Sequence, residues 1–159
     1  MVSTYNRQKA VAYAQKWALS NNPKFYHFDD IGGDCTNFVS QCLLAGDCDM
    51  NYEKYFGWYY INQNNRAPSW TSVEFFKTFL LSNHKKGPFA TLQNISNLQI
   101  GDIIQLKQNV YTYNHTLIIS KIERGQIYIC AHTNDSLNRP LSSYNYLEAK
   151  GFHIEGNRV

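Results

Sequence analysis

The spacing of apolar residues predicts helices in the first half of the chain. Over residues 6–19, alanine, valine and tryptophan fall on one helical stripe and the charged side chains face away from it. Residues 36–46 show the same spacing after a turn with two glycines. A third helix is predicted over residues 71–83, because Thr71 and Glu74 have the spacing of a capping box. The polar stretches 20–34 and 47–69 are predicted to be loops.

The pattern changes in the second half of the chain, where short β-branched or aromatic runs alternate with turn residues. The runs are "LQIGDIIQL", "HTLIISKI", "QIYICAHT" and "GFHIEG". Residues 123–125 read as a hairpin connection that places residues 116–122 beside residues 126–131. The order of elements predicts an α+β fold, with N-terminal helices packed on a small antiparallel β-sheet in a single domain over residues 1–159.

Composition narrows the class of protein. Of the 159 residues, 43% are apolar and 17% charged, which excludes a disordered chain, and no apolar run is long enough to span a bilayer. The formal net charge of +3 is small and its lysines and arginines are scattered, so no nucleic-acid partner is expected. A monomer is expected. The first 20 residues lack the apolar core of a secretory signal, which leaves two alternatives: a cytoplasmic protein, or a domain excised from a longer one.

One cysteine occupies an unusual place. Cys35 stands in "GGDCTNFVSQCLLAG", where a tight turn becomes a helix. Free backbone N–H groups and the helix dipole stabilise a thiolate at a helix N-terminus, which is one way in which a protein activates a nucleophile. Cysteine is also among the residues most often buried, so this stretch alone is equally consistent with a core position.

A cysteine nucleophile needs a proton acceptor, and imidazole serves this role at neutral pH. Two of the five histidines occupy related places: His115 opens one strand of the predicted hairpin and His132 closes the other. An antiparallel hairpin would bring both to the same edge of the sheet. Cys35 and these two histidines could also hold zinc, but the chain has no second ligand pair at the usual spacing, so neither a metal nor a cofactor is expected.

These features resemble a known family. A helix-start cysteine on an antiparallel sheet with a strand histidine is similar to the NlpC/P60 and CHAP amidases, which are papain-like cysteine peptidases of bacterial cell walls. The segments "YNRQKAVAYAQKWA", "GGDCTNFVSQCLLAG", "GWYY", "SWT", "GDIIQL", "NHTLIIS" and "AHTNDSLNRPLS" more closely resemble the family described as putative amidase domains in bacterial proteins. The resemblance implies a papain-like fold and, for an excised domain, a place in the cell envelope or outside the cell.

The resemblance also implies roles for individual residues. Cys35 is the nucleophile and His115 is the base that takes its proton. A third residue should orient the His115 imidazole. On an extended chain the side chains of His132 and Asn134 point to the same side, so both are candidates, and His132 is favoured. The side chain of Asp135 would point to the other side of the extended chain, which makes it the weakest candidate. The backbone N–H of Cys35 supplies the first oxyanion donor, and the second donor is not identified.

Three further residues are candidates for substrate contact. Tyr26 precedes the nucleophile, as a tyrosine does in related enzymes, and Trp70 is one of several aromatic residues that would line the cleft or pack helix on sheet. Asp34 either holds the turn or meets a substrate amine. The predicted function is hydrolysis of an amide bond in peptidoglycan or another peptide substrate through a thioester. The alternatives are a catalytically silent binding module and a thioester-based acyltransferase.

Overall fold

The computed structural model describes residues 1–159. None of its helices has the length and hydrophobicity that crossing a membrane requires. The helices are α1 (Arg7–Trp17), α2 (Cys35–Ala45), α3 (Pro68–Thr71) and α4 (Val73–Ser82), with 3-10 turns at Ile95–Asn97 and Leu141–Ser143. The strands are β1 (Val2–Ser3), β2 (Tyr60–Asn62), β3 (Asn65–Arg66), β4 (Gly87–Gln93), β5 (Ile103–Lys107), β6 (His115–Glu123), β7 (Gln126–Ala131), β8 (Ser136–Pro140) and β9 (Glu148–Arg158).

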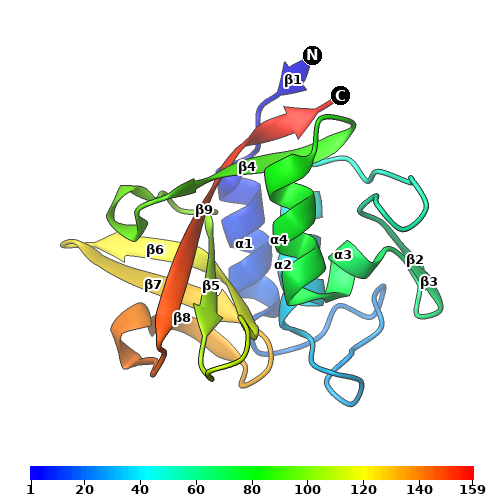
Figure 1. Ribbon diagram of the computed structural model, residues 1–159. Coiled ribbons are helices and arrows are strands. Elements are labelled where there is room, and N and C mark those ends of the chain that lie inside the picture. The colour runs from blue at the N-terminus through cyan, green and yellow to red at the C-terminus, as the bar shows by residue number, and fades with distance from the viewer.

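Seven strands form one antiparallel sheet. Their order is β1-β9-β5-β6-β7-β8, and β4 also pairs with β9. The helices α1, α2 and α4 stand together beside this sheet, and the two chain ends lie close to each other at the top of the view in Figure 1. The predicted mixed α/β architecture with an antiparallel sheet is therefore confirmed.

The sheet separates two apolar clusters. The larger one joins the inner faces of α1, α2 and α4 to the sheet residues Ile103, Ile118 and Cys130. The smaller one is formed by sheet side chains that point to the opposite face, such as those of Ile104 and Leu117. The segment that contains Tyr144 covers it. The α2 helix is the most enclosed helix, since each of its residues from Cys35 to Leu43 is buried. This burial fixes α2 against the sheet.

The β6–β7 hairpin follows the prediction closely. Glu123 pairs with Gln126, which leaves Arg124 and Gly125 as a two-residue turn. Both turn residues have positive φ, 52° and 76°, as a type I′ turn requires. The hairpin brings the start of β6 and the end of β7 to the same edge of the sheet, next to the N-terminus of α2.

The structure differs from the prediction at several elements. The N-cap of α4 is Ser72, whose hydroxyl accepts a hydrogen bond from Phe75 N, because Thr71 belongs to the short helix α3. The strands β4 and β8 were not predicted. The predicted loop 47–69 contains the small β2–β3 hairpin.

Candidate active site

Cys35 is the first residue of α2, as predicted. The preceding turn needs its two glycines, because Gly32 and Gly33 have φ values of 86° and 106°. The side chain of the N-cap residue Asp34 accepts no capping hydrogen bond from a backbone N–H of the helix. The first N–H groups of a helix have no intrahelical partner, so the Cys35 amide is available as a donor.

The Cys35 thiol lies against the beginning of β6. Only 7% of the residue is exposed, and its Sγ is 3.9 Å from the Thr36 hydroxyl. Burial raises the pKa of the Cys35 thiol, while hydrogen bonds from the backbone and side chains of Thr116 and Thr36 act in the opposite direction. The net effect is a protonated thiol in the resting protein, surrounded by donors that favour the thiolate once the proton is removed.

His115 directly precedes Thr116, but its side chain points to the opposite face of β6 from the Thr116 hydroxyl, which meets Thr36 of α2. The structure therefore does not bring the predicted base into contact with Cys35 Sγ. His115 is 5% exposed and pairs with Leu106 of β5. Its ring centroid lies 5.8 Å from that of Tyr144. Burial, followed by the positive charge of Arg139, lowers the pKa of His115 to about 4. The imidazole is therefore neutral at physiological pH, which is the form that can accept a proton.

A buried network holds α2 against β6 under the thiol. The Thr36 and Thr116 hydroxyls are 2.9 Å apart, and Gln105 Nε2 donates to Thr116 Oγ1 at 3.3 Å and to the Val73 carbonyl at 3.0 Å. Thr116 and Gln105 were not identified from the sequence. Their only sequence signal is a polar side chain inside an otherwise apolar strand, which favours a buried hydrogen bond.

Asp34 and His132 form a second buried polar group at the same end of α2. Asp34 Oδ2 lies 2.5 Å from His132 Nδ1, and Asp34 Oδ1 accepts hydrogen bonds from Phe28 N and Asn37 Nδ2, each at 2.8 Å. His132 Nε2 lies 2.7 Å from the Trp17 carbonyl, and the ring stacks on Phe38. Hydrogen bonds to Asp34 and Trp17 outweigh burial and raise the pKa of His132.

Neither candidate for the third residue orients His115 in this structure. Both ring nitrogens of His132 are engaged elsewhere, and its ring stacks on Phe38 in the helix-side cluster whereas His115 lies beside Tyr144 in the other one. Asn134 is exposed and has a φ of 62° in the turn after β7. The parity argument was wrong for Asn134, because the chain bends at residues 133–134 instead of remaining extended.

The three candidates for substrate contact lie in different surroundings. Trp70 is fully buried, and its Nε1 donates to Asn37 Oδ1, so it supports α2 and does not face a cleft. Tyr26 keeps an exposed side chain, but its recorded hydrogen bonds are made by its backbone, with the Tyr60 hydroxyl and with Asn37. Asp34 is buried and holds the turn, which was one of the two roles considered for it.

The Asp34–His132 pair is expected to contribute strongly to stability. Asp34→Asn keeps an acceptor for the Phe28 amide but removes the charge opposite the buried imidazole. We expect the free energy of unfolding to fall by about 3 kcal/mol, as is typical when one partner of a buried ion pair is lost. The measurement is urea unfolding followed by circular dichroism.

The matched control is Asp47→Asn. It breaks the Lys9–Asp47 ion pair, whose side chains are 60% and 50% exposed, and surface pairs of this kind are worth less than about 1 kcal/mol. Equal losses of stability in the two variants would contradict a special role for the buried pair.

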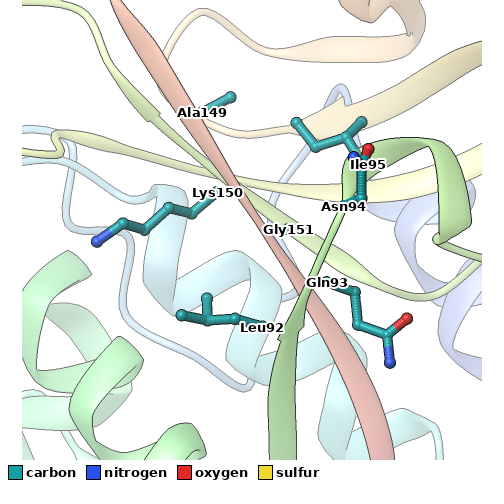
Figure 2. Close-up of a pocket in the computed structure, with 7 residues that line it drawn as sticks. All are labelled: Leu92, Gln93, Asn94, Ile95, Ala149, Lys150 and Gly151. Atoms are coloured by element: carbon teal, nitrogen blue, oxygen red, sulfur yellow. The ribbon is translucent and has the colours of Figure 1, made fainter.

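A pocket of about 470 Å³ lies away from these residues. Figure 2 shows it between the end of β4 and the beginning of β9, with Lys150 and Gln93 among the side chains that line it. It contains neither a thiol nor an imidazole. The pocket therefore does not compete with Cys35 as the reactive centre.

The fold and site define a mixed α/β protein with a buried cysteine at the start of a helix, beside a strand that opens with histidine. The family model described as "Putative amidase domain" matches residues 4–155. The chain belongs to this family.

Two curated relatives come from Bacillus subtilis (strain 168). The uncharacterized protein YhbB is 35% identical over 140 residues, which are 85% of this chain and 43% of YhbB. The uncharacterized protein YjcM is 29% identical over 147 residues, which are 87% of this chain and 33% of YjcM. The chain thus spans less than half the length of either relative. No solved structure gives a significant match.

Proposed function

We propose that the chain is one papain-like cysteine amidase domain, which cleaves an amide bond through a thioester on Cys35. The observation that carries the proposal is the position of Cys35 Sγ, at the N-terminus of α2 and against the backbone of Thr116, the residue that follows His115. Membership of the amidase family supports hydrolysis as the reaction class.

The His115 ring rests beside Tyr144, so the proposed reaction requires it to turn towards the thiol. In the first half of that reaction, Cys35 Sγ attacks the substrate carbonyl carbon while the His115 imidazole takes the thiol proton. The carbonyl electrons move to the oxygen, where the Cys35 N–H donates a hydrogen bond to the developing oxyanion. The C–N bond then breaks, and the amine leaves with the proton that His115 carried. A thioester remains on Cys35.

In the second half, His115 accepts a proton from water, and the resulting hydroxide attacks the thioester carbonyl. The carbon–sulfur bond breaks and the thiolate recovers the proton from His115. His115 is neutral in the resting protein and can therefore accept a proton, but its lowered pKa and the raised pKa of the Cys35 thiol both oppose the transfer. The proposed cycle therefore requires substrate binding to change the surroundings of these two groups.

The proposed substrates are the peptide stems of bacterial cell walls, an assignment that rests on the resemblance to NlpC/P60 and CHAP enzymes. The direct experiment incubates the protein with purified peptidoglycan and with soluble muropeptides, and analyses the products by mass spectrometry. New free amino and carboxyl ends at one stem position support the proposal. Binding to peptidoglycan without any cleavage would favour the silent binding module instead.

The lowered pKa of His115 predicts a stability change that can be measured without a substrate. The folded protein keeps His115 neutral down to about pH 4, whereas the unfolded chain protonates it near the ordinary value of 6.5. Unfolding therefore takes up a proton between these pH values, and stability falls as the pH falls from 6.5 to 4. The expected loss is up to about 3 kcal/mol.

His115→Gln removes this titration, so its stability should change less with pH across the same window. Urea unfolding at several pH values between 7 and 4 checks the prediction. Profiles of equal slope in the wild type and the variant would contradict the assigned burial of a neutral imidazole.

A further inference from the structure

Three potential metal ligands from distant parts of the chain converge beside the N-terminus of α2. They are His27 in the loop before the helix, Asp34 at its N-cap and His132 after β7, and one ligand atom of each lies within 4.8 Å of the others. Asp34 Oδ2 is 2.5 Å from His132 Nδ1 and 3.8 Å from His27 Nε2. No part of this cluster has a role in the proposed reaction.

The remaining polar atoms of Asp34 and His132 are held by other groups. Asp34 Oδ1 accepts from Phe28 N and Asn37 Nδ2, and Oδ2 faces His132 Nδ1, so a metal ion would replace the hydrogen bond between these last two atoms. The Trp17 carbonyl can only accept, so His132 Nε2 donates to it and Nδ1 faces Asp34. Metal-bound histidines are commonly fixed in this way, with the second ring nitrogen donating to a carbonyl.

His27 brings a second imidazole nitrogen to the cluster. Its Nε2 atom is buried and has no hydrogen-bond partner, although 35% of its side chain is exposed. This nitrogen is 2.9 Å from Asp29 Oδ2, whose carboxylate is held on its other oxygen by the Thr133 hydroxyl at 3.2 Å.

The donor set selects a class of metal. Two imidazole nitrogens with carboxylate oxygen suit zinc, whereas calcium and magnesium prefer oxygen ligands alone. In a tetrahedral zinc site with bonds of about 2.0–2.1 Å, neighbouring ligand atoms are about 3.3 Å apart. The separations of 2.5 and 3.8 Å fall on either side of this value, so small side-chain movements would complete the geometry.

We propose that His27 Nε2, Asp34 Oδ2 and His132 Nδ1 form a structural zinc site. The ion would join the loop before α2, the start of that helix and the end of β7. It would thereby fix the turn that carries Cys35 without taking part in the amide chemistry.

The test uses the full chain after treatment with EDTA and dialysis. Titration with zinc chloride, followed by isothermal calorimetry, should show one site per chain in the wild type, and zinc should raise its Tm. His27→Ala should weaken binding at least tenfold and remove most of the Tm increase. Because the His27 side chain is partly exposed, this variant is expected to fold.

Two control variants separate this site from other ligands. His84→Ala removes an exposed histidine elsewhere, and Cys35→Ser removes the nearby thiol, so both should bind zinc as the wild type does. Cobalt in place of zinc should give the visible absorption of a tetrahedral site without a thiolate charge-transfer band. The proposal is overturned if the wild type binds no stoichiometric zinc, if His27→Ala binds it unchanged, or if the cobalt spectrum shows a thiolate ligand.

Discussion

Cys35→Ala is expected to abolish amide hydrolysis while leaving the protein folded. The substitution removes the only atom that forms the proposed thioester, and loss of a covalent nucleophile typically lowers turnover by at least about 10⁴-fold. The thiol makes only weak sulfur contacts with Thr36 and Thr116, so the stability cost should stay near 1 kcal/mol. Product formation from the cleaved substrate and the Tm are measured side by side.

Cys48→Ala is the matched control for this prediction. Cys48 is also a free, buried cysteine, but it lies in the loop after α2 and belongs to the helix-side cluster. Its replacement should leave turnover close to that of the wild type. Hydrolysis that survives in Cys35→Ala would end the thioester mechanism, whatever the control does.

The second large effect is expected for His115→Gln. Glutamine is close to histidine in size but cannot take the thiol proton, so turnover should fall by about 10²–10⁴-fold, the usual contribution of a general base. The affinity for substrate should change little, because the role of His115 lies in proton transfer. Steady-state kinetics separates the two quantities when kcat and KM are determined for both proteins.

The exposed residue His84 provides a control for this comparison. His84→Gln makes the same chemical change just beyond α4, and it should leave kcat unchanged. A His115→Gln variant that keeps the wild-type kcat would show that another group accepts the proton.

Local sequence signals were enough to predict most of the elements that carry the site. The helical spacing and Gly46 predicted α2, and the Arg124-Gly125 turn set the β6–β7 register. The strand β8, Ser136–Pro140, was missed because it is a polar edge strand that ends in proline and pairs on one side only. This strand forms because it pairs with β7, and its own sequence of polar residues does not predict it.

The site was predicted less completely, for a physical reason. Its residues come together through tertiary contacts: Asp34 and His132 are 98 positions apart, and Thr36 and Thr116 are 80 apart. No local pattern encodes such pairs. The turn after β7 also places Asn134 at the surface, because residues 133 and 134 both adopt positive φ.

The raised pKa of the Cys35 thiol is a further difference between expectation and structure. The helix start predicted a thiolate, but burial dominates over the donors around Sγ. We therefore propose that His115, and not the helix terminus alone, activates the thiol. The pairing of these two residues is the central claim of the account.

Site-resolved labelling with iodoacetamide at neutral pH tests this claim most directly, in the wild type and in His115→Gln. Mass spectrometry follows the rates at Cys35, Cys42, Cys48 and Cys130, all of which are free thiols. The account predicts that Cys35 reacts fastest in the wild type and at least tenfold more slowly in the variant, with the other three rates unchanged. A Cys35 rate that is no faster than the others, or that is unaffected by His115→Gln, would contradict it.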